Sequence, residues 1–185
     1  MIDTLQDVTD LVVLAEDEAG LYLQAEAMAV WAPQGQPPEV RLDPRPERIS
    51  FYGSLDLQTG QETVTRADTC NSEATIAHLQ AILEAYPVRP ILLFWDRASW
   101  HRSHAVQHFL QRHGRIEIVE FPVGSPDLNP QEHVWKAVRR TIEHNHQHDR
   151  FGSLADAFEH ELRTRHFPSA FFRKYGGAVV CPMLE

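Results

Sequence analysis

Two short apolar runs, each followed at once by acidic residues, are the feature that most constrains this chain's fold. They are LVVLA at 11–15, with three acids at 16–18, and ILLFW at 91–95, which ends at Asp96. Runs this short and this rich in branched and aromatic residues are typical of strands buried on both faces. Acids crowded at the end of a buried strand repel one another unless a cation or a basic group lies there. We therefore expect a sheet whose strand ends carry a charged site.

The rest of the pattern predicts an α/β fold with a mixed sheet. Strands are expected at 21–23, 49–57 and 62–65, with a turn at 58–60, and they form an antiparallel meander with the first run. Helical and strand patterns then alternate, with helices at 72–86, 103–112, 130–144 and 153–165, strands at 91–95 and 116–121, and C-terminal helices within 153–175. A meander followed by βαβα units implies antiparallel and parallel strands in one sheet, with helices on its faces.

Composition sets the size and the class of the protein. The chain has 185 residues and is 43% hydrophobic, which suits a single globular domain over 1–185. Its net charge of -9 argues against gripping nucleic acid by bulk electrostatics, but not against an acidic site that recruits metal ions before it meets a phosphate. Two distant cysteines, Cys70 and Cys181, no apolar run of membrane-spanning length and no signal-peptide pattern indicate a cytoplasmic protein.

The stretch SPDLNPQEHVW at 125–135 is a rigid entry into a helix. Asn129 suits the cap, and Pro130 suits the first helical position, where a missing N–H is no loss. Glu132 then lies in the first turn, beside the positive end of the helix. The apolar face of this helix carries Val134 and Val138, so Glu132 lies off the core-facing stripe and is free to face a site.

Three sets of acids are placed where they can meet. They are the cluster around Asp17, the lone Asp96, and Glu132. One helix, one strand and two connections separate Asp96 from Glu132, so the chain can return to the same edge of the sheet. Carboxylates held together at neutral pH are stabilised by divalent cations, and Mg²⁺ prefers oxygen ligands. Two such ions about 4 Å apart stabilise the attacking and leaving oxygens of an in-line phosphoryl displacement.

Several motifs together resemble one known family. The chain is similar to the catalytic domain of DDE transposases, specifically the mariner-like transposases of bacterial insertion sequences. The resemblance covers about residues 11–142 and rests on DEAGLYL at 17, WAPQGQPP at 31, SFYGSLDLQTG at 50, ILLFWDRASWHRS at 91 and FPVGSPDLNPQEHVWKAVRR at 121.

This resemblance implies a fold, a reaction and a set of partners. The fold is ribonuclease-H-like, and Asp17, Asp96 and Glu132 match the three acids that hold two Mg²⁺ or Mn²⁺ ions. The reaction is DNA strand cleavage followed by strand transfer, which is DNA transposition. The partners are transposon-end and target DNA, with the protein as a homodimer in the bacterial cytoplasm, at the nucleoid when active. The family's N-terminal helix-turn-helix region is expected to be absent from this chain, so a separate chain could supply end recognition.

Basic residues near these acids are candidates for contact with DNA. Arg97 stands where the family usually has a small or amide residue, and it could pair with Asp96 or touch a DNA phosphate. His101 could approach the scissile phosphate or stabilise its loop. The remaining candidates for phosphate contact are Arg102, Lys136, Arg139 and Arg140.

Two other interpretations stay open at the level of sequence. The chain could be an inactive or domesticated DNA-associated remnant, with Arg97 occupying the metal site. It could also be a stand-alone metal-dependent endonuclease without strand-transfer activity.

Overall fold

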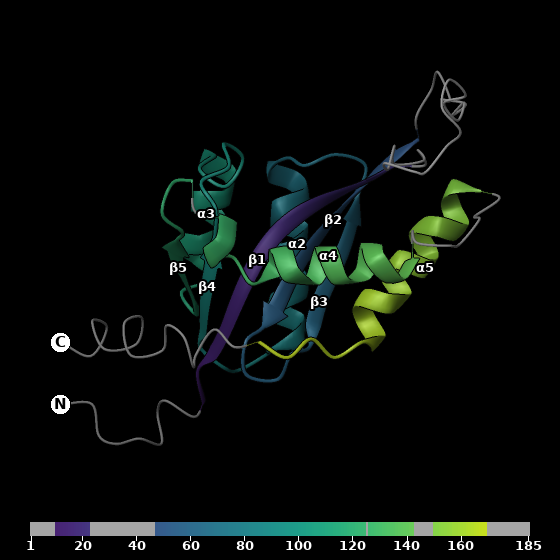
Figure 1. Cartoon of the computed structure of the whole chain (residues 1–185). Helices are drawn as coiled ribbons and strands as arrows, with labels where there is room; N and C mark the ends of the chain where they lie inside the picture. Colours follow the sequence, from purple (N-terminus) through teal and green to yellow (C-terminus); the bar gives the residue numbers. More distant parts are fainter. Residues whose placement is uncertain (1–9, 23–46, 125, 143–149, 170–185) are drawn as a thin grey trace, which may run out of the picture.

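A five-stranded mixed sheet with helices on both faces forms the protein (Figure 1). The computed structural model of the chain describes residues 10–22, 47–124, 126–142 and 150–169. Its strands are β1 Val12–Tyr22, β2 Arg48–Asp56, β3 Glu62–Ala67, β4 Ile91–Trp95 and β5 Ile116–Glu120. Its helices are α2 Ser72–Ala85, α3 His104–Arg112, α4 Gln131–Ile142 and α5 Phe151–Thr164, with a short 3-10 turn at Pro126–Leu128.

The order of the strands confirms the expected topology. The sheet runs β3-β2-β1-β4-β5, with β1–β2 and β2–β3 antiparallel and β1–β4 and β4–β5 parallel. The meander therefore supplies one half of the sheet and the βαβα units the other. The motif at 31–38, residue 23 of the strand expected at 21–23, Cys181, and the parts of the expected helices at 143–144 and 170–175 lie outside the described residues.

The prediction that the first strand ends before its acids is wrong. β1 continues without a break through the three acids to Tyr22. Leu21, expected in a separate strand, therefore belongs to β1 and pairs with Ile49 of β2. Consecutive side chains of a strand point to opposite faces. Asp17 therefore faces one side of the sheet, while Glu16 and Glu18 face the other.

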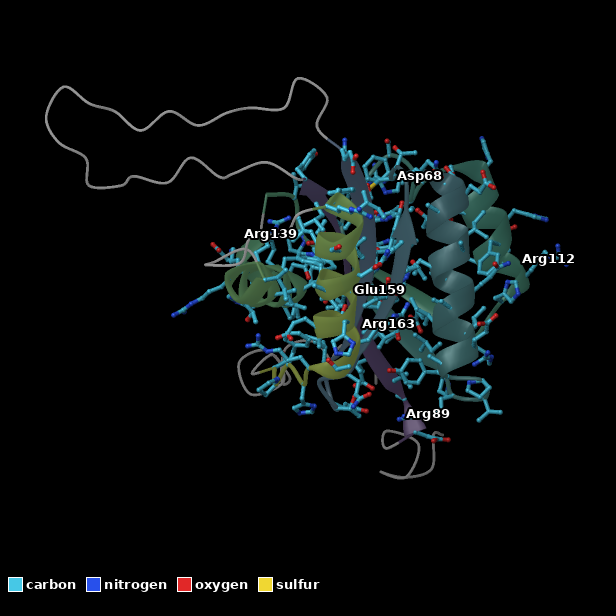
Figure 2. The ribbon with its side chains drawn as sticks, turned by 90° about the vertical axis from the view of Figure 1, so that its right-hand side faces the viewer. Asp68, Arg89, Arg112, Arg139, Glu159 and Arg163 are labelled. Carbon is cyan, nitrogen blue, oxygen red and sulfur yellow. The ribbon has the colours of Figure 1, made fainter. Side chains whose placement is uncertain are left out.

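Two apolar layers follow the same alternation. Val13 and Ala15 of β1 pack with Val134 of α4 and Phe158 of α5, and Val12 and Leu14 pack on the other face with residues of α2 and α3. Figures 1 and 2 show α4 and α5 on one side of the strands and α2 on the other. The side of the sheet that carries Asp17 is thus the side that α4 covers.

Local chemistry explains where the helices begin. Asn71 and Ser103 each cap a helix through a side-chain oxygen that accepts a backbone N–H three residues on. Before α4, the Asn129 side-chain oxygen accepts from the backbone N–H of Gln131 at 3.1 Å, as a capping residue should. Within the described part of the chain, no helix is long and apolar enough to cross a membrane.

Gly53 of β2 sets how closely α4 approaches the sheet. A Cβ at this position would overlap the side chains of Gln131 and Trp135, both on α4, and of Glu62 on β3. A larger residue here would push α4 outward, and with it the first turn that carries Glu132.

We expect Gly53→Ala to destabilise the fold by about 1–3 kcal/mol, the usual loss on overpacking a close contact. Urea unfolding followed by circular dichroism measures the change. Gly114→Ala is the matched control, because a Cβ at Gly114 has nothing within 4 Å. Equal stability of both variants would show that α4 does not depend on this close approach.

Candidate active site

Asp17 lies in the middle of β1, the central strand of the sheet. Its Oδ2 accepts a hydrogen bond from the indole Nε1 of Trp135 on α4, at 3.1 Å. Trp135 is itself buried between the sheet and Phe158 of α5, with ring centroids 6.3 Å apart. The helix that carries Glu132 therefore also orients the first aspartate.

Asp96 follows β4 directly and is the most open of the three predicted acids, with a side chain 54% exposed. The β1–β4 register pairs Ala15 with Phe94, so Asp17 and Asp96 each lie two residues beyond the same pair. The backbone N–H of Ala98 and the ring of His101 both contact Oδ1 of Asp96, at 2.8 and 3.2 Å. Both contacts use the same oxygen, and Oδ2 accepts no hydrogen bond from the described residues.

Glu132 reaches the same region from the first turn of α4. Asn129 fixes the start of that helix, since its oxygen caps the backbone at Gln131 and its amide donates to the Glu16 carbonyl oxygen of β1 at 3.4 Å. The Glu132 side chain is partly exposed and lies 3.7 Å from the ammonium of Lys136, one turn along.

One pocket contains all three predicted acids. Its volume is about 370 Å³, and its walls come from the ends of β4 and β5, the middle of β1 and the start of α4. Asp17, Asp96 and Glu132 line it, together with Arg97, Asn129 and residues 121–124. The structure thus brings together three carboxylates that lie far apart in the sequence.

The electrostatics of this pocket favour a cation. Burial, then the neighbouring charges of Glu18 and Glu132, raise the pKa of Asp17 from 3.8 to about 7, although the Trp135 hydrogen bond opposes the rise. The pKa of Asp96 is lowered, first by its hydrogen bond to His101. Carboxylate oxygens are the ligands that Mg²⁺ and Mn²⁺ take, and a divalent ion would relieve the repulsion at Asp17, so the residues present fit these metals.

A second charged cluster lies on the opposite face of β1. Glu16, Glu18 and His101 bring ligand-type atoms within 4.8 Å of one another, a spacing that would also suit a metal ion. The imidazole Nε2 lies 3.1 Å from Glu18 and 3.7 Å from Glu16, while Trp100 Nε1 donates to the same Glu18 oxygen at 2.6 Å. The Glu16 carboxylate accepts no hydrogen bond within the described part of the chain.

This second cluster contains its own cation. Burial lowers the pKa of His101, but hydrogen bonds to Asp96 and Glu18 and the charge of Glu16 outweigh it and raise the pKa to about 10. Burial, followed by the charge of Glu18, raises the pKa of Glu16 well above its usual value. Because His101 already supplies a basic group to this cluster, the cluster needs no metal, and the open pocket is the better candidate.

Arg97 and Arg102 pair with the same acid. Arg97 Nε lies 3.0 Å from Glu120 at the end of β5, and Arg102 Nη2 lies 3.3 Å from the same carboxylate oxygen. Arg97 therefore pairs with Glu120 and not with Asp96, although it lines the pocket. Both arginines remain about half exposed.

The side chain of His101 is only 1% exposed, which disfavours direct contact with a DNA phosphate in this structure. The ring is stacked on Trp95, with centroids 4.2 Å apart and planes 4° from parallel. Of the two roles that the sequence left open, the structure supports the one within the loop.

The three basic residues of α4 differ in their surroundings. Lys136 and Arg140 are exposed, whereas the half-buried Arg139 donates to the Gly20 carbonyl oxygen at 3.1 Å. Figure 2 shows Arg139 on the opposite side of the molecule from Arg112 of α3. Lys136 and Arg140 are therefore the ones best placed to reach a phosphate.

Sequence reasoning missed the residues that support the acids. Trp135 gave no signal beyond its place at the edge of the apolar face of α4. For Glu18 the sequence holds a signal only if the strand is taken to continue past residue 15. Strand alternation then places Glu18 and Asp17 on opposite faces of the sheet.

Known proteins similar to this chain identify its family. The family model described as DDE superfamily endonuclease matches residues 12–155. The insertion element IS630 uncharacterized 39 kDa protein of Shigella sonnei is 28% identical over 153 residues, which cover 82% of this chain and 45% of that protein. The chain thus spans about half the length of this curated relative.

Solved structures agree on the fold. The Mos1 mariner paired-end complex with Mg has a TM-score of 0.66 at 16% identity, covering 92% of this chain and 55% of that one. The Mos1 mariner transposase catalytic domain has a TM-score of 0.56 at 14% identity, covering 89% of this chain and 74% of that one. The ribonuclease-H-like fold expected from the motifs is confirmed, and the match over most of the chain shows that it belongs to the DDE superfamily endonucleases.

Proposed function

We propose that this chain is a transposase catalytic domain that cleaves DNA strands and joins them to a target by metal-dependent phosphoryl transfer. The observation that carries the proposal is that Asp17, Asp96 and Glu132 line one and the same open pocket. Family membership supports the reaction class, since it names an endonuclease. The similar Mos1 mariner paired-end complexes were solved with Mg or with Mn, which supports the choice of metal.

Asp17 and Asp96 would hold two Mg²⁺ or Mn²⁺ ions, with Glu132 completing the shell of the second. When bound, such ions polarise the scissile phosphate and stabilise the attacking and leaving oxygens. Trp135 orients Asp17, and Asn129 fixes where α4 and Glu132 begin. The half-exposed Arg97, at the wall of the pocket, is placed to contact a DNA phosphate.

The reaction has two displacements at phosphorus. Water attacks at the transposon end, and the phosphorus–O3′ bond breaks to release a 3′ hydroxyl. That hydroxyl then attacks a target phosphate, forming one P–O bond as another breaks. The proposal includes a homodimer acting on paired ends in the bacterial cytoplasm, at the nucleoid, and a separate helix-turn-helix chain for end recognition.

The contact of Arg97 with Glu120 argues against the alternative of an inactive remnant. That alternative requires Arg97 to occupy the metal site, and Arg97 pairs with Glu120. The alternative of a plain nuclease differs from the proposal only in the second displacement. Incubating the chain with a pre-cleaved transposon end and a labelled target separates the two, since only a transposase joins them.

Asp17→Asn, Asp96→Asn and Glu132→Gln should each reduce metal-dependent nicking of supercoiled plasmid by about 100-fold or more. Metal stabilisation of the transition state is worth several kcal/mol, and each 1.36 kcal/mol is tenfold in rate. Asp127→Asn is the control, because Asp127 is an exposed acid in the turn just before α4 and does not line the pocket. Equal nicking by wild type and Glu132→Gln would contradict the assigned site.

Without metal, Asp17→Asn should be more stable than wild type at pH 8. The folded-state pKa of Asp17 is raised from 3.8 to about 7, so the stability of the wild type falls as the pH rises through this window. The melting temperature of the variant in EDTA should exceed that of the wild type at pH 8, and the difference should shrink towards pH 4. Added Mn²⁺ should then stabilise the wild type only. A difference in melting temperature that does not change with pH would show that the pKa of Asp17 is not raised in the folded protein.

Lys136→Ala and Arg140→Ala should each flatten the salt dependence of DNA binding. Each lost phosphate contact reduces the slope of log K against log salt by about 0.9. Gel-shift titrations at several salt concentrations measure the slope. Arg112→Ala is the control, since Arg112 is also an exposed arginine but lies on α3, away from α4 (Figure 2). An equal change in the control would mean that binding is unspecific over the surface.

A further inference from the structure

His101 connects β1, the strand that carries Asp17, to Asp96, the residue that follows β4. Nδ1 lies 3.2 Å from both Oδ1 and the backbone oxygen of Asp96, and Nε2 lies 3.1 Å from Oε1 of Glu18. Glu18 directly follows Asp17 in β1. The imidazole ring of His101 thus connects Glu18, the neighbour of Asp17, to Asp96.

The backbone gives no such connection at this level of the sheet. The ladder between β1 and β4 ends at the pair Ala15 and Phe94, two residues short of both aspartates. Beyond this pair, β1 stays hydrogen-bonded to β2 only, and β4 runs out into the loop that carries His101. The contact from Glu18 through His101 to Asp96 continues the connection where the ladder stops.

Neighbouring residues hold both the ring and the backbone of His101. Trp95 stacks on it in parallel, Trp100 lies edge-on at 6.2 Å, and the side-chain amide of Gln107 donates to the His101 backbone oxygen at 3.2 Å. Trp100 also donates its indole N–H to the Glu18 oxygen that faces the ring. A side chain fixed on this many sides can hold Glu18 and Asp96 at a constant distance from each other.

We propose that Glu18 and His101 are positioning residues that set the separation of Asp17 and Asp96 and the orientation of the Asp96 carboxylate. This rests on the proposed function, because it assigns the pair a role only if both aspartates bind metal. His101 does not line the pocket. It fixes Oδ1 of Asp96 and so leaves Oδ2 as the oxygen that meets a cation.

Two substitutions of His101 separate its contacts. By count of bonds from Cβ, the amide nitrogen of Gln stands where Nε2 stands, and that of Asn stands where Nδ1 stands. His101→Gln therefore keeps a donor for Glu18 and loses the one for Asp96, while His101→Asn does the reverse.

The readout is the affinity of the intact chain for Mn²⁺, measured by electron paramagnetic resonance without DNA. His101→Gln should bind Mn²⁺ about 10–100-fold more weakly, the usual loss when a residue behind a ligand is removed. His101→Asn should recover part of this loss. His78→Gln is the matched control, because His78 is an equally buried histidine whose ring bonds to Ser54 and Thr65 and to no acid. It should lose stability but keep its Mn²⁺ affinity.

Unchanged affinity in His101→Gln, with Asp96→Asn weakened, would overturn the positioning role and leave the proposed function standing. Unchanged affinity in Asp96→Asn would overturn the proposed function instead. If circular dichroism shows that His101→Gln does not fold, Trp100→Phe takes its place. That variant removes only the indole N–H from Glu18, and it should weaken Mn²⁺ binding in the same direction. Wild-type affinity in a folded Trp100→Phe would overturn the proposal.

Discussion

Repulsion between carboxylates at the centre of the sheet is the interaction on which the rest of this structure depends. Three consecutive acids stand in the central strand, and a fourth directly follows the strand beside it. Removing such groups from water is unfavourable, and their proximity adds to the cost. Alternation along β1 places Asp17 on one face of the sheet and Glu16 and Glu18 on the other. The negative charge is compensated differently on the two faces.

On the face covered by α2 and α3, the protein supplies the compensating charge itself, through His101. On the face covered by α4, it supplies one indole N–H from Trp135 and leaves Asp17 with a raised pKa in an open pocket. One face is therefore complete without a ligand, and the other is not. This difference, more than the number of acids, points to the pocket as the place where a divalent cation belongs.

Much of this arrangement could be predicted from the sequence. The apolar runs at 91–95 and 116–121 and the helical period from 72 correspond to β4, β5 and α2 within a residue or two. Asn129 and Pro130 marked the start of α4, because capping is local chemistry. The grouping of Asp17, Asp96 and Glu132 in one pocket came from the family resemblance as well as from strand order, and their roles in catalysis stay a prediction.

What could not be predicted depends on contacts between distant residues. The first strand was taken to end at its acids, since charge is rare inside a buried strand. Its continuation is possible because His101, 83 residues away from Glu18, lies against it. No local pattern in the sequence reports a partner so far along the chain, and the role of Trp135 as a donor to Asp17 was hidden for the same reason.

Asn129 shows how narrow the choice of residue can be at a single position. Asp, Ser and Thr are all good helix caps in isolation. Here the side chain must accept from Gln131 and also donate to the Glu16 carbonyl of β1, one atom for each task. Aspartate would lose the donor and add a negative charge beside the pocket, and a hydroxyl would have to serve both partners from one oxygen. The amide is the side chain that joins the helix to the strand without adding charge where there is already too much.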